Sequence, residues 1–598
     1  MSNTHSPQKY LVCVAWPYAS GDRHLGHVAG AYLPPDIYAR YQRLRGRDVR
    51  MVSGSDTHGT PVTVAAAREG VSNIEIFTRY HTRFVHSFRD LGLSFDLFTH
   101  TDTQNHWDVT HEFFLNHLAN GYLYRATQAQ PFCLVDQRFL ADRYIEGTCP
   151  TCGYTDARGD QCDNCGNLFD AVELIDPRCK ICGQSQIEVR ETEHFFFDLG
   201  KASPHLAAWL NDGHKGHWRQ AVFNYARQQA ESGELRGRAI TRDIDWGISI
   251  PVAGFEDKVI YVWYDAVQGY LSATREVCAL QGDPEAWKAW WFDPAVKSLY
   301  FIGKDNIPFH AIQWPAFLIA DGRGLNLPYD VPANEYLNIE DKKISTSRRW
   351  SIDLPDFLSR YDPDPLRYAL TINAPETRDV NFTWDEFLRR NNDELVATWG
   401  NLVNRVLGFA YKRFDAQIPT PGPFDPVDQA LLAESAAAFE RVGEEIEAVR
   451  LKIALEKAFA LAHSTNRYLN DKAPWAQIKS DPAAAATTIY VALQVIDHLK
   501  VLLNPFLPFT TQQLHHFLGY DGDIFGRLTT EEVPDARGVH LVLRYDGSDL
   551  AAHWAPATLP PGQALRPPQA LYKKLDDSIV EQERARLQEH LSLSAAAA

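Results

Sequence analysis

The sequence predicts an α/β protein with a doubly wound parallel sheet, which an insertion interrupts and an all-α helical bundle follows. Three observations lead to this fold class. Strand-like apolar runs alternate with a helical pattern near the start, a stretch rich in Cys, Gly and Asp begins after about residue 120, and long amphipathic helical patterns begin near Trp384. Alternating strands and helices are typical of parallel sheets, whereas helical patterns alone are typical of bundles.

Four strand-like runs make up the predicted sheet. The first covers 10–15 and is followed by a helical stretch near 35–45 and a second run at 48–53. Two further runs, 259–263 and 298–302, come only after the insertion. The simplest interpretation is one Rossmann-like sheet in two halves, with the carboxyl ends of all four strands at a single cleft.

At 598 residues the chain exceeds what one hydrophobic core organises, so several regions are expected. A segment rich in Pro and Ala at 553–570 reads as a linker before a charged helix around 571–591. The expected regions are the first half of the sheet at 1–120, the insertion at 121–252, the second half at 253–330, a loop and linking domain at 331–395, the helical domain at 396–552, and a linker with a helix at 553–598.

Composition indicates a soluble globular protein. Hydrophobic residues make up 45% and charged residues 23%, and no stretch approaches the roughly 18 apolar residues of a membrane span. The first residues show no basic region followed by an apolar one, so we expect a cytoplasmic protein with no membrane contact. The net charge of -17 argues against indiscriminate nucleic-acid binding, which needs many Lys and Arg, so any RNA contact must use local basic patches.

The nine cysteines favour metal ligands or free thiols over disulfides in a cytosolic protein. Cys149 and Cys152 form one Cys-x-x-Cys hairpin, and Cys162 and Cys165 form another. Four thiolates in this arrangement can surround Zn²⁺ tetrahedrally and leave no ligand position open. We therefore predict a structural zinc rather than a catalytic one.

Candidate nucleotide contacts follow the predicted strands, where ligands of open α/β sheets bind. His24-Leu25-Gly26-His27 comes after the first strand, Asp56-Thr57-His58-Gly59 after the second, and Gly303-Lys304-Asp305 after the last. There is no P-loop sequence. Alone, the histidine pair would be a capped helix start with solvent-facing rings, but Lys343-Ile344-Ser345-Thr346-Ser347 far downstream favours a nucleotide site.

In this order the two motifs resemble the two ATP signatures of class I aminoacyl-tRNA synthetases. The resemblance implies that an amino-acid carboxylate attacks the α-phosphorus of ATP, through positioning and charge stabilisation. His24 and His27 would bind phosphate in the transition state, and Lys343 would stabilise the leaving pyrophosphate. The implied ATP-binding residues are His24, Gly26, His27, Gly303, Asp305, Lys343, Ser345 and Ser347, with Mg²⁺ accompanying ATP.

One residue of the downstream loop departs from the family pattern. Thr346 stands where the pattern has its second lysine, so the loop has one positive charge fewer. Arg348 and Arg349 are candidates to replace that charge. Lys343 is expected to be essential and Thr346 to contribute little.

Four further blocks resemble the methionyl-tRNA synthetase family: 13–18, 54–59, 261–266, and 303–305 with Phe309-His310. The aromatic residues suit a thioether side chain, and Asp56 can pair with the α-ammonium group. The implied methionine-binding residues are Ala15, Tyr18, Asp56, Trp263, Ala266, Tyr270 and His310. Trp16 and Val267 depart from the Leu and Pro that resembling sequences carry.

A third cysteine pair, Cys179 and Cys182, could belong to a second zinc site. Resembling sequences with two zincs have a partner Cys-x-x-Cys upstream, where this chain has Cys133-Leu134-Val135-Asp136. A Cys3Asp zinc site is chemically possible, because Asp oxygen binds zinc at about 2.0–2.2 Å. A decayed site with free thiols is the alternative.

In the helical half, Asn401 and Arg405 are four residues apart and share one helix face, and Trp475 follows an Ala-Pro pair. Alone these residues read as a polar helix face and a core tryptophan. The resemblance implies instead that they contact the tRNA anticodon, with the aromatic ring stacked on a base. Longer family members append a tRNA-binding barrel that dimerises them, and its absence here favours a monomer.

The favoured function is a methionine-tRNA ligase, which makes methionyl-adenylate from L-methionine and ATP and transfers methionine to the 3' end of tRNA(Met). A synthetase for cysteine is one alternative, against which Trp16 and Tyr18 argue. A catalytically silent tRNA-binding paralogue is another, motivated by Thr346. The insertion leaves little room for the editing domain of the isoleucine, valine and leucine enzymes.

Overall fold

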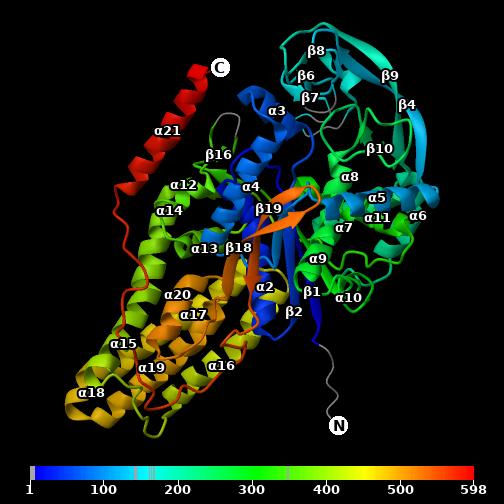
Figure 1. Cartoon of the computed structure of the whole chain (residues 1–598). Helices are drawn as coiled ribbons and strands as arrows, with labels where there is room; N and C mark the ends of the chain where they lie inside the picture. The colour runs from blue at the N-terminus through cyan, green and yellow to red at the C-terminus, as the bar shows by residue number, and fades with distance from the viewer. Residues whose placement is uncertain are drawn as a thin grey trace, which may run out of the picture.

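The computed structural model describes residues 7–140, 144–159, 162, 164–165, 169–345 and 349–597, without the side chains of 590 and 593–597. Its centre is a seven-stranded sheet with the order β14-β13-β1-β2-β3-β19-β18 (Figure 1). The first five are parallel, β19 is antiparallel to β3, and β18 is antiparallel to β19. Their bounds are β1 Lys9–Val14, β2 Asp48–Ser55, β3 Leu97–His100, β13 Lys297–Gly303, β14 Ala333–Asn334, β18 Arg527–Asp535 and β19 Gly538–Asp546.

Helices cover both faces of this sheet because its strands are apolar on both sides. Along β1, Tyr10, Val12 and Val14 belong to a core shared with α2 and α4, whereas Leu11 and Cys13 belong to a core shared with α5, α9 and α11. The helical segments are α1 Leu25–His27, the π-helical η1 Val28–Tyr32, α2 Leu33–Leu44, α3 Thr60–Glu69, α4 Asn73–Asp90, α5 Gln104–Ala119, α8 Val262–Ala266, α9 Gly269–Leu280, α10 Lys288–Trp291, η4 Lys304–Asn306, η5 Phe309–Gln313 and α11 Trp314–Asp321.

The strands predicted at 10–15, 48–53 and 298–302 are confirmed as β1, β2 and β13. The prediction of a sheet strand at 259–263 was wrong. Only Val259–Ile260 is extended, as β12, and it pairs with β11 (Thr241–Arg242) outside the main sheet. The following residues form α8, which is buried, and a short apolar run fits a buried helix as well as a strand.

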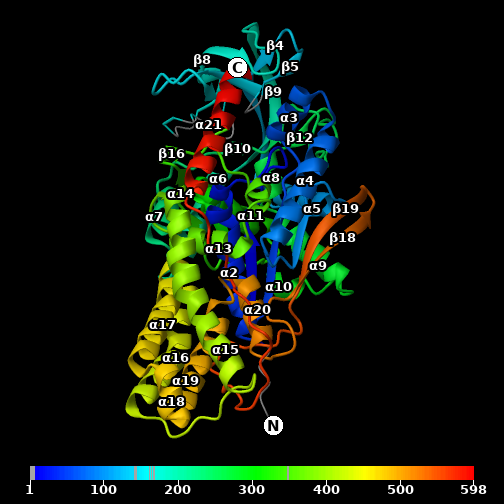
Figure 2. The same cartoon turned by 90° about the vertical axis from the view of Figure 1, so that its left-hand side faces the viewer.

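The β-strands of the insertion form a lobe at one end of the molecule (Figure 2), whereas its helices α6 (Leu199–Leu210) and α7 (Gln220–Glu231) pack into the core on one face of the main sheet. The long strands β4 (Leu123–Cys133) and β9 (Ile187–Phe197) pair antiparallel and carry a small cysteine-containing core. The other elements of the insertion are β5 Arg138–Phe139, β6 Ile145–Thr148, β7 Ala157–Arg158, η3 Ala171–Glu173, β8 Ile175–Cys179 and β10 Arg238–Ala239.

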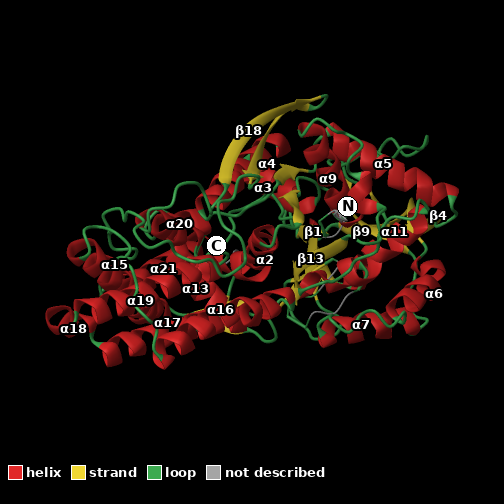
Figure 3. Ribbon diagram, turned by 90° about the horizontal axis from the view of Figure 1, so that it is seen from below, coloured by secondary structure: helices red, strands yellow, loops and turns green. Residues whose placement is uncertain are grey.

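A linking region leads from the sheet into the helical domain, which Figure 3 shows apart from the strands. Its elements are β15 Leu337–Ile339, β16 Lys342–Lys343, α12 Leu354–Leu358, α13 Pro363–Ile372, β17 Val380–Phe382 and α14 Trp384–Arg389. The helical domain contains η6 Arg390–Gly400, α15 Asn401–Arg413, α16 Pro426–Glu447, α17 Leu451–Lys472, α18 Pro474–Ser480, α19 Pro482–Leu503 and α20 Pro508–Phe517.

Within the described residues one helix, α19, has the length and composition of a membrane span, and its apolar window is fully buried inside the molecule. It packs against α16, α17 and α18 as the central helix of the bundle.

The expectation of helices alone across 396–552 was wrong for its last part. After α20 the chain forms the β18–β19 hairpin, which leaves the helical domain and completes the edge of the main sheet beside β3. The remaining chain runs back along the helices to α21 (Ile579–Ala597), which begins later than the predicted start near 571.

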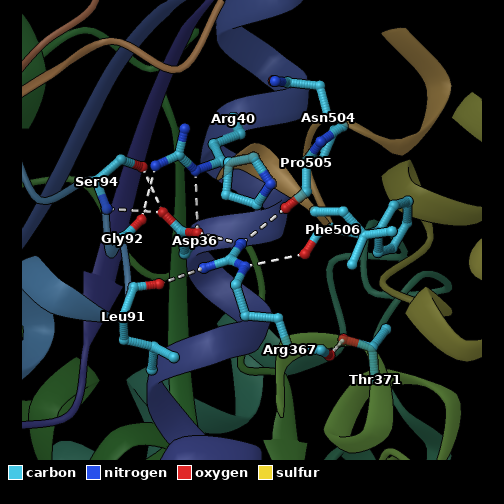
Figure 4. A network of polar contacts seen from close by, with 12 residues as sticks. Asp36, Arg40, Leu91, Gly92, Ser94, Arg367, Thr371, Asn504, Pro505 and Phe506 are labelled. Atoms are coloured by element: carbon cyan, nitrogen blue, oxygen red, sulfur yellow. Dashed lines mark hydrogen bonds and ion pairs between the residues drawn. The ribbon is translucent and has the colours of Figure 1, made fainter. Parts of the chain in front are cut away.

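A buried ionic network fixes the helical domain to the sheet (Figure 4). Asp36 of α2 accepts hydrogen bonds from Arg40 (3.1 Å) and from Arg367 of α13 (2.6 Å). Arg367 also donates to the carbonyl oxygens of Pro505 and Phe506, between α19 and α20. Burial alone would raise the pKa of Asp36, but the two arginines outweigh this effect and hold the pKa below its usual value, so the carboxylate stays ionised. Removing Asp36 from this network would leave the buried charges of both arginines without a carboxylate between them.

Candidate functional site

The carboxyl ends of the parallel strands open into a cleft of about 2200 Å³ that extends to the insertion lobe. Many of the predicted site residues lie on its walls. Those that line the cleft are Ala15, Tyr18, His24, Gly26, His27, Trp263, Gly303, Asp305, Lys343 and Ser345. Asp56, Ala266, Tyr270 and His310 lie behind the wall, and Ser347 and Thr346 fall outside the described residues.

His24 and His27 form one compact unit at the start of α1. Their rings stack with centroids 3.7 Å apart, and the backbone N–H of His24 donates to Nδ1 of His27 at 3.2 Å. Burial and the neighbouring Arg23 together lower the pKa of His24 to about 3, and burial, His24 and Arg23 lower that of His27 well below its usual value. Nδ1 of His24 is buried and has no hydrogen-bond partner among the described residues. Two neutral imidazoles therefore face the cleft as hydrogen-bonding groups.

The downstream lysine loop lies directly against the histidine motif. A Cβ atom on Gly26 would come within 2.8 Å of Cδ1 of Ile344, so the absence of a side chain permits this contact. The backbone N–H of Leu25 donates to the carbonyl of Ile352, and that of Leu354 donates to the carbonyl of Arg23. Two motifs more than 300 residues apart thus form one wall of the cleft.

Lys343 is exposed at the end of β16, with its Nζ atom 5.3 Å from the centre of the Tyr336 ring. Lys304 packs on the same ring at 4.0 Å and forms ion pairs with Glu335 (2.7 Å) and Asp379 (2.8 Å). The hydroxyl of Tyr336 donates a hydrogen bond to Asp305. Sequence reasoning missed Tyr336, which organises both lysines and has no motif of its own.

An aromatic pocket lies next to the histidine motif. Tyr18 meets the Trp263 ring edge-on at 6.0 Å, and Phe309 stacks on Trp263 at 4.1 Å. Behind them the Tyr270 hydroxyl is hydrogen-bonded to Nε2 of His310 at 2.7 Å, and burial lowers the pKa of His310 to about 4. Phe309 was not among the predicted pocket residues, although it immediately precedes His310. An apolar slot closed by buried polar groups is the usual form of a small-molecule site.

Asp56 lies at the end of β2, beside Tyr18, and is almost fully buried. The backbone N–H of His58 donates to Asp56 at 3.2 Å, and Nδ1 of His58 contacts Asp265 at 3.0 Å. Burial and the neighbouring Asp265 raise the pKa of Asp56 well above its usual value, and His58 offsets only part of this rise. His58 and Asp265 lie within the family-like segments 54–59 and 261–266, but no role was predicted for them from the sequence.

Two clusters in the insertion lobe can each hold a metal ion, with all four candidate ligand atoms within 4.8 Å of one another. In the first, the sulfurs of Cys149 and Cys165 are 3.9 Å apart and those of Cys152 and Cys162 are 3.6 Å apart. These separations are close to the edge of about 3.8 Å for a tetrahedron with 2.3 Å zinc–sulfur bonds. Hydrogen bonds from the Tyr154 backbone and from Asn164 lower the pKa of Cys152 to about 6, which favours the thiolate.

The second cluster joins Cys133, Asp136, Cys179 and Cys182. The sulfurs of Cys133 and Cys182 are 3.6 Å apart, and a carboxylate oxygen of Asp136 lies 3.0 Å from the sulfur of Cys179. The structure thus brings together all four residues of the Cys3Asp set. A site decayed by sequence divergence would not be expected to keep its ligand atoms converged.

At the far end of the molecule from these clusters, α15 and α18 present the predicted anticodon residues (Figures 1 and 2). Asn401 and Arg405 are one helical turn apart on α15. The guanidinium of Arg405 lies 4.6 Å from the centre of the Trp475 ring, and Phe409 meets that ring edge-on at 5.5 Å. Trp475 is only half-buried, so it combines a packed edge with an accessible surface.

Comparisons with known proteins agree with these features. Residues 10–407 match the family model described as "tRNA synthetases class I (M)", and 418–532 match the "Anticodon binding domain of methionyl tRNA ligase". The chain is 56% identical to a methionine–tRNA ligase of Thermomicrobium roseum, over 97% of this chain and 99% of that one, and 51% identical to one of Roseiflexus, again over 97% and 99%. A crystal structure of Mycobacterium tuberculosis methionyl-tRNA synthetase bound by methionyl-adenylate superposes with a TM-score of 0.74 at 26% identity, over 94% of this chain and 100% of that one.

Proposed function

Because the chain belongs to the methionyl-tRNA synthetases of class I and is a methionine–tRNA ligase, we propose that both steps of its reaction take place in the cleft at the strand ends. L-Methionine and ATP give methionyl-adenylate and pyrophosphate, and methionine then passes to the 3' end of tRNA(Met). The protein contributes position and charge rather than a covalent intermediate. The relatives named above all charge methionine, which argues against a cysteine enzyme and against a silent paralogue.

The histidine motif and the lysine loop bind the phosphates of ATP from one wall of the cleft. His24 and His27 are neutral and offer N–H donors to the α-phosphate as it becomes pentacoordinate, and Gly26 leaves room for the nucleotide near the backbone. Lys343 neutralises the departing pyrophosphate, which enters as part of Mg²⁺-ATP. Gly303, Asp305, Ser345 and Ser347 complete the ATP contacts. The contact between Gly26 and Ile344 is the observation that carries this assignment.

Methionine lies in the aromatic pocket, with Asp56 paired to its ammonium group. Its thioether packs on Tyr18 and Trp263, where sulfur–aromatic contacts are favourable. Ala15 and Ala266 leave space for the chain, and Tyr270 with His310 closes the end of the slot. Exclusion of side chains shorter by one methyl is worth only about 1–3 kcal/mol, so homocysteine is expected to be a poor but real substrate.

Zinc is the metal we assign to both clusters, since Cys thiolates with tetrahedral spacing are its preferred ligands. Both sites are structural because no ligand position remains for substrate. They stabilise the lobe that borders the cleft. We further propose that the protein is a cytoplasmic monomer. In this proposal 1–120 and 253–330 form the catalytic domain around the zinc-binding insertion at 121–252, and 331–395 is the linking domain. The helical part of 396–552, which ends with α20, binds the anticodon, and 553–598 is the closing linker and helix.

The proposal for the lysine loop is tested by methionine-dependent ATP–pyrophosphate exchange. Lys343→Ala should lower kcat by about 10²–10³, the loss typical of removing one group that stabilises developing charge. Lys342→Ala is the matched control, because Lys342 is also exposed in β16 but packs on Trp350 at 4.4 Å. Unchanged exchange in Lys343→Ala, or an equal loss in both variants, would contradict the assignment.

The anticodon assignment is tested by separating the two reaction steps. Trp475→Ala should raise KM for tRNA(Met) about 5- to 150-fold, since one stacked base is worth about 1–3 kcal/mol, while pyrophosphate exchange without tRNA stays unchanged. Arg405→Met should raise the same KM. The assignment fails if aminoacylation of tRNA(Met) is normal in Trp475→Ala.

A further inference from the structure

The β18–β19 hairpin, which lies late in the chain, contacts the start of α5 behind the methionine pocket. Its tip lies against the first turn of α5, where Asp535 accepts a hydrogen bond from the backbone N–H of Gln104 at 2.7 Å. Arg537 donates from Nε and Nη2 to the same carboxylate oxygen of Asp102, at 2.8 and 2.6 Å. Its guanidinium also stacks 3.7 Å above the Trp107 ring. These contacts hold the Arg537 side chain in one position.

Asp102 continues this chain of contacts inward to His58. The same oxygen of Asp102 is 3.9 Å from Nε2 of His58. On its other side His58 contacts Asp265 through Nδ1 (3.0 Å) and Asp56 through its backbone N–H (3.2 Å). His58 is 1% exposed, and Asp56 and Asp265 are 2% and 0% exposed. Polar groups so deeply buried need partners, and His58 is the partner shared by Asp56 and Asp265.

Both negative and positive groups surround His58 and determine its charge. Three carboxyl groups can carry negative charge here, those of Asp56, Asp102 and Asp265. Two cationic groups face them, Arg537 and His58. His100 and His106 also lie nearby, and burial lowers the pKa of both, so they are neutral. Burial alone would lower the pKa of His58, but the neighbouring carboxylates of Asp102 and Asp265 raise it to about 9. His58 is therefore an imidazolium near neutral pH and offsets the two buried carboxylates beside it.

We propose that Arg537 and Asp102 are positioning residues for methionine binding, which act through His58 to keep Asp56 available for the substrate ammonium group. The proposal rests on the assignment of Asp56 to that group. Without Arg537, Asp102 loses two N–H donors and no longer faces His58 in a fixed orientation. Asp56, Asp102 and Asp265 then share His58 as the one cation among them, and Asp56 is more readily protonated. A segment of the C-terminal half thus contributes to amino-acid recognition as well as to the sheet.

The test is steady-state pyrophosphate exchange with Arg537→Met, which removes the charge and keeps the length of the side chain. KM for methionine should rise about five- to tenfold, which corresponds to about 1–1.4 kcal/mol, while kcat and KM for ATP stay within about twofold. Arg537→Lys should restore most of the affinity. Arg544→Met is the matched control, because Arg544 lies on the same hairpin but its ion pair, to Glu531, is within the hairpin.

The pH dependence separates this role from a loss of structure. The ratio of KM in Arg537→Met to KM in the wild type should be largest near pH 6.5 and shrink towards pH 9, because Asp56 is more readily protonated in the variant and rising pH removes that proton. The titration of the substrate amine cancels in this ratio. A ratio that is constant with pH, an equal effect of Arg544→Met, or an unchanged KM in Arg537→Met would overturn the proposal.

The Asp56→Asn variant separates a failure of the Asp56 assignment from a failure of the hairpin proposal. If it raises KM for methionine strongly but Arg537→Met has no effect, the pocket assignment stands and the hairpin proposal falls. If Asp56→Asn leaves KM unchanged, the assignment of Asp56 itself falls, and with it the pathway through His58.

Discussion

A methyl group on Gly26 tests whether the two ATP motifs form one wall. In Gly26→Ala the new Cβ would lie 2.8 Å from Cδ1 of Ile344 and 3.1 Å from Cε1 and Nδ1 of His24. Such overpacking costs about 1–3 kcal/mol. If the cost falls on the conformation that binds ATP, kcat/KM for ATP decreases about 5- to 150-fold.

Ile344 accounts for the shorter of these contacts, and its side chain can be removed. We expect Ile344→Ala alone to lower kcat/KM by less than about threefold. The double variant Gly26→Ala/Ile344→Ala should be at least about fivefold more active than Gly26→Ala, a coupling of about 1 kcal/mol. Full recovery is not expected, because the contact with His24 at 3.1 Å remains.

The assay is methionine-dependent pyrophosphate exchange at varied ATP concentrations. Gly30→Ala is the control, since a Cβ atom on Gly30 would meet nothing within 4 Å although it lies in the adjacent turn of the same helical segment. The reasoning is refuted if the double variant is no more active than Gly26→Ala, or if Gly30→Ala is equally impaired.

Three further predictions concern the rest of the molecule. Arg367→Met should destabilise the protein by about 1–3 kcal/mol, because the buried carbonyls of Pro505 and Phe506 lose their donor while Arg40 still pairs with Asp36, and the change is measured as a lower Tm with intact exchange activity per folded molecule. Metal analysis should find two zinc ions per chain in the wild type and one in Asp136→Ala; a single zinc in the wild type would remove the second site. Burial lowers the pKa of His106 to about 3 and of His117 to about 4, so these groups stay neutral in the folded state but protonate below about pH 6.5 when unfolded. Stability should therefore fall as the pH drops from 6.5 towards 4, by up to about 1.4 kcal/mol per pH unit for each histidine, and a Tm that rises over this range would contradict the assignment.

Local sequence pattern predicted those parts of the fold whose partners are near in the chain. The run 10–15 and the helix that follows are apolar with clear periodicity, so β1 and α2 were predicted close to their observed bounds. The run 259–263 was ambiguous because a short buried helix and a buried strand have the same composition. The β18–β19 hairpin could not be predicted as part of the sheet, since nothing in its own sequence indicates that it pairs with β3.

The residues of the functional site also differ in how far the sequence predicts them. The two ATP motifs were found because each is a contiguous pattern with a resemblance. Tyr336, Phe309 and Asp265 were missed as functional groups because their roles depend on neighbours that only folding brings together. For Asp136 the sequence left two interpretations open, and the convergence of its carboxylate on three cysteine sulfurs favours the metal site.

The position of the hairpin also affects how the protein is made. Nε2 of His81 in α4 is hydrogen-bonded to the carbonyl oxygen of Leu541 in β19, which lies 460 positions later in the chain. At about 5–20 residues per second, synthesis of the intervening chain takes about 20–90 seconds. During that time the β3 edge of the nascent sheet has no neighbouring strand, and open strand edges pair readily with other chains. Ribosome-bound chains that end before residue 546 should therefore aggregate more and bind chaperones for longer than the finished protein.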